Sequence, residues 1–290
     1  RKIMRIKAML AYKYDKSKLD FNDPAGMPMI QPKLDGIRCI FTKDGAYSRA
    51  QNRFMNVEHL EKKLEFFFEK NPDVVLDGEL YNHELKKDFE KIVSLVKKQK
   101  PKDKDKEEAK KLVQYHIYDI IPIKPSMNTF YNKRHDIICK WFNKSPYTTG
   151  PVKIVNTYPC VDEKAMEKFH KAFLKEGYEG SILRKNAFYK NKRSWNLQKI
   201  KDFNDTEATI IGYEIGKGKR KGTIGKFLMQ DDEGIEFGCP PGKGYTYKDM
   251  KDMLENIDDY IGQRATFTYF QRTKAGSYRH PLFKGLRNYE

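Results

Sequence analysis

Near its start the sequence places a tight turn between two short apolar runs, and this arrangement constrains the fold of the first part of the chain. The two runs lie on either side of the eight residues Gln31–Arg38. Gly36 supplies the backbone freedom that a tight turn needs, so the pattern predicts a strand, a turn and a second strand. Lys33 then lies at the end of the first strand, close to the carboxylate of Asp35. A lysine amine in such a setting can act as a covalent nucleophile, although an ordinary surface turn uses the same residue types.

Strands and amphipathic helices alternate from this turn to about residue 201. Apolar residues at helical spacing predict helices, and short apolar or alternating runs predict strands. The predicted helices cover 56–69, 89–96, 131–142 and 162–177, and the predicted further strands cover 46–49, 73–77, 115–121, 152–157, 180–184 and 197–201. Asn56 and Asp162 are the expected N-caps of two of these helices. The charged segment 97–111 is expected to be a solvated loop or a frayed helix end.

Beyond about Asp202 short strands with glycine turns replace this alternation. Strands are expected at 207–215, 223–230, 235–239 and 264–271, with one helix at about 247–257. About five strands with one helix in fewer than ~100 residues fit a small Greek-key barrel such as the OB-fold. We therefore expect an α+β chain in which residues 1–201 form mainly antiparallel sheets with flanking helices. Residues 202–290 are expected to form an OB-fold β-barrel.

The composition favours a polyanionic partner and excludes several other classes of protein. The chain has 57 Lys and Arg against 40 Asp and Glu, a formal net charge of +17, and tyrosines and phenylalanines are interleaved with the cations. Such a surface is typical of nucleic-acid binding. The four cysteines and six histidines lack the spacing of a zinc site, so we expect free thiols. No membrane span or signal peptide is visible, which predicts no membrane partner and a cytoplasmic location.

Several other predicted strand ends carry a carboxylate or a cation in the same manner as Lys33. These residues are Arg49, Asp77, Glu79, Glu179, Lys199 and Lys201. If the strands form one core, the side chains converge beside the lysine. Nucleotidyl transfer needs this set of groups: a positioned nucleophile, cations for the phosphate oxygens and carboxylates that hold a metal ion.

Six motifs then resemble those of the covalent nucleotidyltransferases, and more closely those of the minimal ATP-dependent DNA ligases of viruses and bacteria. In chain order they are K-x-D-G-x-R at Lys33–Arg38, S-R at Ser48–Arg49, D-G-E at Asp77–Glu79, aromatic-Asp at Tyr118–Asp119, E-G-x-x-x-R at Glu179–Arg184 and K-x-K at Lys199–Lys201. Their order and rough spacing agree with the family over nearly the whole chain. The resemblance implies an adenylation domain followed by an OB-fold domain.

The resemblance also implies a reaction with ATP and nicked duplex DNA. Lys33 would attack the α-phosphate of ATP and carry AMP as a phosphoramidate. AMP would pass to the 5′-phosphate of the nick, and the 3′-hydroxyl would then seal the break. Mg²⁺, or Mn²⁺ in its place, is the implied metal ion, DNA replication and repair are the implied settings, and we expect a monomer.

The resemblance assigns the charged residues to the metal ion, the nucleotide and the nick. Glu179 would bind Mg²⁺, with Glu79 or Asp35 contributing, although Glu179 could instead be a charge partner of the lysines. Glu79 and Arg49 would contact the AMP ribose or the nick phosphate. Arg38 would bind the 5′-phosphate of the nick, where a bidentate guanidinium is stronger than a lysine.

The adenine and the α-phosphate have their own implied contacts. Tyr118 would stack on the adenine, and the carbonyl oxygen of Gln31 could accept a hydrogen bond from the adenine N6 amine. Lys199 and Lys201 would hold the α-phosphate. An ordinary core tyrosine and a solvated strand edge are the respective alternatives.

Further cations are expected to bind DNA or to assist the first step. Arg193 resembles a contact to the nick phosphate in the small ligases, and the basic loop at residues 216–222 is expected to hold DNA phosphates. The loop cations are Lys217, Lys219, Arg220 and Lys221. Arg279 and Arg287 lie in a segment that resembles the family's closing motif and would reach the pyrophosphate of ATP. The chain departs from that motif after Arg287, where it continues as Asn288-Tyr289-Glu290.

Other activities with the same lysine chemistry remain as alternatives. An RNA ligase or a GTP-using capping enzyme would share the covalent step, and a nucleic-acid-binding protein would share only the basic surface. The predicted OB-fold and the closing motif argue against the first two. All of the expected catalytic side chains are present, which argues against the third.

Overall fold

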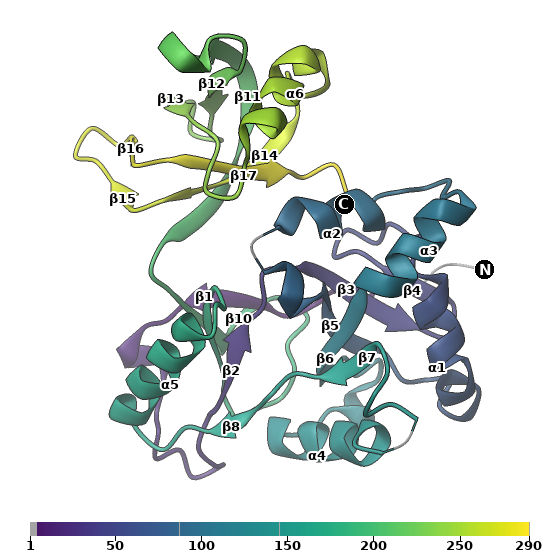
Figure 1. Cartoon of the computed structure of the whole chain (residues 1–290). Helices are drawn as coiled ribbons and strands as arrows, with labels where there is room; N and C mark the ends of the chain where they lie inside the picture. The colour runs from purple at the N-terminus through teal and green to yellow at the C-terminus, as the bar shows by residue number, and fades with distance from the viewer. Residues whose placement is uncertain (1–4, 87, 145, 290) are drawn as a thin grey trace. The chain divides into compact units, whose positions relative to one another are not determined.

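The computed structural model describes residues 5–86, 88–144 and 146–289, which form two compact units (Figure 1). The first unit ends at Lys201, and the second runs from Asp202 to Tyr289. Each unit has its own hydrophobic core and is described below by itself.

Two five-stranded sheets form the first unit. The first sheet has the order β1 (Leu10–Lys13), β10 (Arg193–Lys201), β9 (Gly180–Arg184), β2 (Met29–Lys33) and β8 (Tyr158–Pro159). The second sheet has the order β4 (Gly45–Tyr47), β3 (Ile37–Thr42), β5 (Leu76–Tyr81), β6 (Gln114–Ile120) and β7 (Val152–Ile154). Only the β1–β10 and β6–β7 pairs are parallel among the described strands. The prediction of mainly antiparallel sheets is therefore confirmed.

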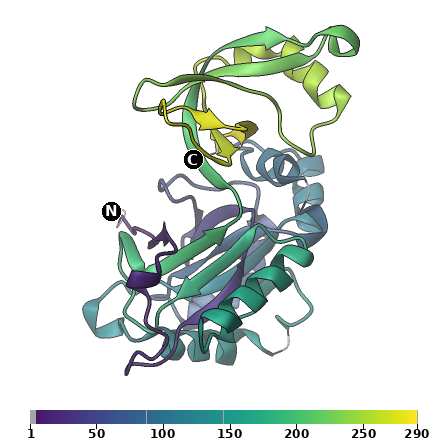
Figure 2. The same cartoon turned by 90° about the vertical axis from the view of Figure 1, so that its left-hand side faces the viewer.

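The helices of the first unit cover the sheets with their apolar faces. They are α1 (Glu58–Lys70), α2 (Phe89–Val96), α3 (Asp103–Leu112), α4 (Tyr131–Phe142) and α5 (Glu163–Lys175). Helix α5 lies against β2 and β9 (Figure 2), and α4 packs on β6 and β7. The carboxylate of Asp162 accepts a hydrogen bond from the amide of Ala165, which confirms it as the N-cap of α5.

The start of α1 differs from the sequence prediction. Val57 occupies the N-cap position, and no side chain caps the helix. Asn56 instead donates hydrogen bonds to the carbonyl oxygens of Leu95 (3.0 Å) and Asp105 (3.2 Å). Its buried amide thus links α1 to the α2 and α3 region, and the prediction that Asn56 caps the helix is wrong.

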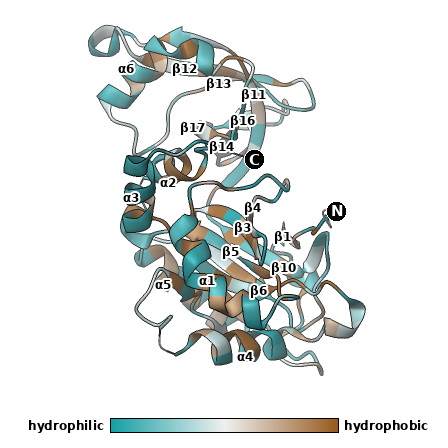
Figure 3. Cartoon of the chain, turned by 90° about the vertical axis from the view of Figure 1, so that its right-hand side faces the viewer, coloured by the Kyte–Doolittle hydropathy of each residue, from teal (hydrophilic) through white to brown (hydrophobic). Residues whose placement is uncertain are grey.

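The charged segment before β6 forms a regular helix, α3, rather than a loop. Its surface is hydrophilic along nearly its whole length (Figure 3), yet Ala109 on its inner side is 1% exposed. Asp105 accepts a hydrogen bond from the amide of Lys102, and acidic residues in the first turn with lysines in the last turn complement the helix dipole. Charge order along the helix, which composition does not reveal, explains why the segment is helical.

The turn after Lys33 carries the chain from one sheet to the other, because β2 belongs to the first sheet and β3 to the second. A Cβ atom at Gly36 would lie 2.4 Å from the carbonyl oxygen of Leu80 on β5. Only glycine therefore allows the turn to approach the second sheet so closely. Lys33, at the end of β2, and Arg38, on β3, thus lie on the two sides of this turn.

The second unit is a five-stranded sheet with one helix. The strand order is β13 (Glu236–Cys239), β12 (Ile224–Gln230), β11 (Asn204–Ile215), β14 (Arg264–Tyr269) and β17 (Leu282–Leu286), and the helix is α6 (Tyr247–Glu255). A short hairpin of β15 (Gln271–Arg272) and β16 (Tyr278–Arg279) follows β14 and was not expected from the sequence. Phe227, Phe267 and Phe283 lie in its core.

The expected closed barrel is not formed by the described strands. The two outer strands of the order, β13 and β17, do not pair with each other in the part of the chain that the structure describes. Pro241, which follows β13, forms an isolated bridge with Phe283 of β17. Strand and helix content agree with the prediction, whereas closure of the sheet does not.

Two further expectations concern the cysteines and the membrane. All four cysteines are free thiols, as predicted. Within residues 5–86, 88–144 and 146–289, no helix has the length and apolar character needed to cross a membrane.

Candidate active site

Two lysines from different strands of the first sheet meet at the carboxylate of Glu179. The amine of Lys33 donates a hydrogen bond to Glu179 Oε2 over 2.9 Å, and Lys201 Nζ pairs with Glu179 Oε1. The side chains of Lys33 and Glu179 are 20% and 18% exposed, so a substrate can reach them. The sheet thus places one carboxylate between two lysines at an accessible position.

The register of β9 explains this meeting. Gly180 lies opposite Lys33 on β2 and also opposite Lys201 on β10, so Glu179 immediately before it lies between the two neighbouring strands. A Cβ atom at Gly180 would lie 2.0 Å from the carbonyl oxygen of Ile200. A side chain at this position would force the strands apart and separate the three charged groups.

Arg38 on β3 is held by a buried carboxylate of the second sheet. Its Nε and Nη2 donate to the two oxygens of Asp77 over 2.6 and 2.7 Å, and Nη2 also donates to the carbonyl oxygen of Met9 over 2.9 Å. The hydroxyl of Tyr189 donates to Asp77 Oδ2 over 2.7 Å. Asp77 is fully buried, so these contacts fix the guanidinium of Arg38 in one orientation.

Glu79 lies opposite Arg38 on the neighbouring strand β5. Burial raises the pKa of Glu79 to about 8, although the positive charges of Arg38 and Lys33 act in the opposite direction. Its carboxyl is therefore largely protonated at neutral pH in the free protein. Glu179, by contrast, contacts a lysine amine with each of its two carboxylate oxygens.

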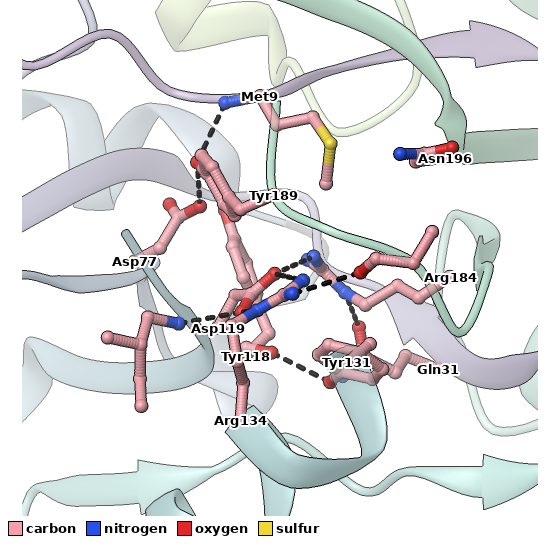
Figure 4. A network of polar contacts seen from close by, with 12 residues as sticks. Met9, Gln31, Asp77, Tyr118, Asp119, Tyr131, Arg134, Arg184, Tyr189 and Asn196 are labelled. Carbon is pink, nitrogen blue, oxygen red and sulfur yellow. Dashed lines mark hydrogen bonds and ion pairs between the residues drawn. The ribbon is translucent and has the colours of Figure 1, made fainter. Parts of the chain in front are cut away.

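A second buried carboxylate, Asp119 on β6, organises the network in Figure 4. Arg134 on α4 donates from Nε to Asp119 Oδ1 over 2.8 Å, and Arg184 on β9 donates from Nη1 to Asp119 Oδ2 over 2.9 Å. Arg184 Nε also donates to Gln31 Oε1 over 2.7 Å. This network joins α4 and the second sheet to the first sheet, where it ends at Gln31, two residues before Lys33.

The ring of Tyr118 lies between the guanidinium groups of two arginines. The Cζ atoms of Arg38 and Arg184 are 5.2 and 4.8 Å from its ring centroid. Tyr118 is half-buried, and burial raises the pKa of its hydroxyl well above the ordinary value. The neutral ring thus links the two arginine–aspartate pairs and keeps part of its surface accessible.

The remaining predicted residues of the first unit differ in how far they are exposed. Asp35 is half-buried in the turn after β2, Arg49 is half-buried in the turn after β4, and Lys199 is half-buried on β10. Arg193 is exposed at the start of β10 and donates from Nη1 to the carbonyl oxygen of Ala11 over 2.6 Å.

The predicted residues of the second unit fall into two groups. The loop between β11 and β12 carries four exposed cations: Lys217, Lys219, Arg220 and Lys221. Arg279 on β16 is also exposed. Arg287, by contrast, is half-buried and donates to Glu207 Oε1 over 2.9 Å and to Thr266 Oγ1 over 3.2 Å.

Sequence reasoning assigned no role to Arg134, Tyr131 or Tyr189 of this network, nor to Thr157, whose hydroxyl accepts a hydrogen bond from Gln31 Nε2 over 2.9 Å. Arg134 shares one helix face with Tyr131 and Ile138, and an arginine among buried positions at helical spacing is a usable signal. Tyr189 lies in a connecting segment, where no periodic pattern indicates which side chains are buried. Thr157 lies at the end of the predicted strand 152–157, but β7 ends at Ile154 and Thr157 belongs to the connection to β8.

A metal ion at this site would need substrate oxygens as further ligands. Among the described residues, no three His, Cys, Asp or Glu side chains are grouped so that they could hold a metal ion. Mg²⁺ is commonly bound by one or two carboxylates together with substrate phosphates and water. The oxygen donors of Glu179 and Glu79 fit such an ion, Glu79 after loss of its proton.

Comparison with known proteins identifies both units. Residues 8–201 match the family model "ATP dependent DNA ligase domain", and residues 215–287 match "DNA ligase OB-like domain". A DNA ligase of African swine fever virus is 27% identical over 209 residues, which are 68% of this chain and 47% of the viral protein. A DNA ligase of Haemophilus influenzae is 23% identical over 263 residues, 90% of this chain and 87% of that protein. The chain thus spans about half the length of the viral relatives that it matches.

Solved structures show the same fold. A Lig E DNA ligase has a TM-score of 0.56 at 24% identity, covering 98% of this chain and 100% of that one. Chlorella virus DNA ligase-adenylate has a TM-score of 0.53 at 25% identity, covering 97% of this chain and 98% of that one. Both similarities include the two units.

Proposed function

The chain belongs to the family of ATP-dependent DNA ligases, and from this premise we propose that it joins 5′-phosphate and 3′-hydroxyl ends at nicks in duplex DNA. The observation that carries the proposal is the contact of Lys33 Nζ with Glu179 Oε2 at 2.9 Å, with Lys201 on the other carboxylate oxygen. A nucleophile, a proton acceptor and a second cation are thereby present at one accessible point.

In the proposed first step Lys33 forms a bond to the α-phosphorus of ATP. The bond between the α-phosphorus and the oxygen that bridges to the β-phosphate breaks, and pyrophosphate leaves. The amine must lose its proton to become a nucleophile, and Glu179 is the acceptor that already contacts it. Lys201 and Lys199 on β10 provide positive charge for the α-phosphate oxygens as they gain negative charge.

Mg²⁺ is the proposed metal ion, and Glu179 is its best protein ligand. A bound Mg²⁺ would neutralise negative charge on the phosphates. Glu179 would hold the ion as the carboxylate, after it has passed the proton accepted from Lys33 to water and has lost its ion pair with that lysine. Glu79 would take part only as the carboxylate, because burial raises its pKa to about 8.

The adenine would lie toward Tyr118 and Gln31. Tyr118 offers a partly accessible neutral ring on which a base can stack. Gln31 is 1% exposed, and Arg184 already donates to its carbonyl oxygen over 2.7 Å. One lone pair of that oxygen is left for the adenine N6 amine. A base would reach it only after the side chains that bury Gln31 move.

The later steps would use cations of the first unit, among them Arg38, together with cations of the second unit. Arg38 retains Nη1 for the 5′-phosphate of the nick while Asp77 holds its other two nitrogens. Arg193 and the cations of loop 216–222 would bind DNA phosphates, and Arg49 with Glu79 would contact the ribose or the nick. Arg279 would act on pyrophosphate in the first step, whereas Arg287 must first leave Glu207. We expect the protein to act as a monomer on nicked DNA.

The proposal is tested by covalent labelling followed by a chase. The protein is mixed with Mg²⁺ and α-labelled ATP or GTP, and the labelled protein is then given duplex DNA with a 5′-phosphorylated nick. Label from ATP that is released as the nick is sealed supports the proposal. Label from GTP alone would indicate a capping-type activity, transfer only to nicked RNA would indicate an RNA ligase, and absence of label would refute the lysine chemistry.

Matched lysine variants test the nucleophile. Lys33→Arg keeps a positive charge beside Glu179 but removes the amine, so labelling should be lost while the fold is kept. Lys175→Arg, at the exposed end of α5, is the control and should label normally. Persistent labelling of Lys33→Arg would move the nucleophile to another residue.

A further inference from the structure

Thr157 lies beside Gln31 although no sequence motif singles it out. It directly precedes β8, whose Tyr158 is paired with Ile30 on β2. Thr157 Oγ1 accepts a hydrogen bond from Gln31 Nε2 over 2.9 Å and donates to the carbonyl oxygen of Val155 over 2.8 Å. Thr157 is half-buried whereas Gln31 is 1% exposed, so Thr157 is the member of this pair that a ligand can reach.

The polarity of the hydrogen bonds around Gln31 is fixed by its neighbours. The guanidinium of Arg184 can only donate, so Gln31 must present its carbonyl oxygen to it and its amide nitrogen to the other side. There the amide donates to the hydroxyl of Tyr131 over 2.9 Å as well as to Thr157. The hydroxyl of Tyr131 in turn donates to the carbonyl oxygen of Tyr118 over 2.8 Å (Figure 4). The amide of Gln31 therefore has one allowed orientation.

This orientation determines what Thr157 can offer to a ligand. A backbone carbonyl can only accept, so the hydroxyl hydrogen of Thr157 is used by Val155. One lone pair of Oγ1 is used by the amide of Gln31. The hydroxyl of Tyr131 also contacts Thr157, but its single hydrogen is donated to the carbonyl oxygen of Tyr118. The remaining lone pair of Thr157 Oγ1 can therefore accept one more hydrogen bond, and the group has no hydrogen left to donate.

The position of this acceptor relative to Lys33 suits a nucleotide. Gln31 and Lys33 are two residues apart on β2, so their side chains share a face about 7 Å apart along the strand. With the α-phosphate at Lys33, the ribose spans this distance and the base comes to lie near Gln31 and Thr157.

We propose that Thr157 accepts a hydrogen bond from the exocyclic 6-amino group of the purine and that Arg184, acting through Gln31, is the positioning residue that keeps Thr157 an acceptor. The inference rests on the proposed function, and it assigns to these two residues the recognition of the 6-amino group of its ATP substrate. A 6-oxopurine such as that of GTP or ITP would place its carbonyl oxygen, which can only accept, against Thr157 Oγ1, which can also only accept. A site whose polar group is left unpaired discriminates against such an analogue.

The network behind Arg184 keeps this arrangement rigid. Asp119 accepts from Arg184 and from Arg134, and it is fully buried. Arg184 therefore cannot turn away from Gln31 without leaving Asp119 with a single guanidinium partner in a dry setting. The selectivity would thus be fixed before the nucleotide binds.

The test compares covalent labelling of the full chain by α-labelled ATP and ITP with Mg²⁺. ITP differs from ATP at the 6 position and lacks the 2-amino group of GTP. Thr157→Val removes the hydroxyl at nearly constant volume, and the ratio of kcat/KM for ATP to that for ITP should fall roughly tenfold through loss on ATP. Thr157→Ser keeps the hydroxyl and should keep the ratio within about twofold of the parent.

Arg184→Lys provides the second variant. A lysine keeps a positive charge beside Asp119 but lacks the fork that contacts Asp119 and Gln31 together, so the ratio should fall in the same direction. An unchanged ratio in Thr157→Val, or a parent protein that is labelled equally by ATP and ITP, would overturn the inference and leave the lysine chemistry intact. A parent protein that is labelled by neither nucleotide would overturn the proposed function, and the inference with it.

Discussion

Asp77 on β5 and Asp119 on β6 lie opposite one another in the second sheet, and neither carboxylate is exposed to solvent. Two buried negative charges on adjacent strands would repel each other, so each needs cationic partners. Arg38 contacts Asp77, while Arg134 and Arg184 contact Asp119. The arginines outnumber the aspartates in this cluster, which leaves excess positive charge beside the site. We expect this excess to favour the binding of a triphosphate.

Arg134 should contribute strongly to stability although it contacts no proposed substrate. It pairs with Asp119 and donates from Nη1 to the carbonyl oxygens of Thr129 and Ala187. Arg134→Met should lower the free energy of unfolding by about 3 kcal/mol, near the lower end for a broken buried ion pair because Arg184 still contacts Asp119. Urea unfolding measures the change.

The control for Arg134 lies on the same helix. Lys140→Met replaces an exposed cation of α4 and should change the free energy of unfolding by less than about 0.5 kcal/mol. Equal effects of the two substitutions would mean that the ion pair with Asp119 contributes nothing to stability.

Tyr189 should separate the nick-sealing steps from adenylation. Its hydroxyl accepts from the amide of Met9 and donates to Asp77, each over 2.7 Å, and Asp77 orients Arg38. Tyr189→Phe should lower the free energy of unfolding by about 2 kcal/mol because the buried amide of Met9 loses its acceptor. Sealing of a pre-adenylated nick should slow roughly tenfold through misplacement of Arg38, with adenylation unchanged.

A second buried tyrosine serves as the matched control. The hydroxyl of Tyr115 donates to the carbonyl oxygen of Cys39 over 2.9 Å and has no contact with Asp77 in the described hydrogen-bond network. Tyr115→Phe should destabilise the protein to a similar degree without slowing the sealing step. If both variants seal nicks equally well, Asp77 does not need the hydroxyl of Tyr189 to hold Arg38.

The fold was predictable wherever local pattern dominates, and less so where pairing is distant. Most strands and helices of the first unit follow from apolar spacing. Strand β1, Leu10–Lys13, was missed because four residues carry no period and its partner β10 lies about 180 residues away along the chain. Helix α3 was missed because its stability depends on charge order and on a single buried alanine, Ala109.

The site was predictable to the extent that its chemistry lies in short motifs. Lys33, Glu179 and Lys201 come together because Gly180 aligns three strands, and each of them could be singled out in the sequence. The sequence around Thr157 gives no such signal, because the proposed role of Thr157 depends on the side-chain amide of Gln31, which lies 126 residues away along the chain. Residues that orient other residues have no required spacing, and only the folded chain identifies them.

Glu79 should make the free energy of unfolding fall as the pH rises from 7 to 8. Burial raises the pKa of Glu79 to about 8 in the folded chain, whereas an unfolded glutamate has a pKa of about 4.5. Between these values the folded state binds a proton that the unfolded state has lost, so rising pH favours unfolding. The slope contributed by this group is at most about 1.4 kcal/mol per pH unit. Above pH 8 the slope flattens as the folded carboxyl ionises.

Glu79→Gln removes this titration and is the comparison variant. Its free energy of unfolding, measured in urea at a series of pH values, should fall less steeply than that of the parent between pH 7 and 8. Burial lowers the pKa of His116 to about 3. Its titration therefore changes the free energy of unfolding mainly below pH 7 and adds little to the slope of either protein between pH 7 and 8. Parallel curves for the two proteins would show that the carboxyl of Glu79 is already ionised in the folded state.

The loop between β11 and β12 should supply a large part of the salt-dependent affinity for DNA. Its four exposed cations are Lys217, Lys219, Arg220 and Lys221. Replacing all four by Gln should weaken binding to a nicked duplex and reduce the slope of log K against log [salt] by up to about 3.6, because each neutralised phosphate contributes about 0.9. The matched control removes the same charge from the exposed lysines of α5, which are Lys164, Lys168, Lys171 and Lys175. Fluorescence anisotropy over a salt series measures both proteins, and equal slopes for the two would show that overall charge rather than the loop attracts the DNA.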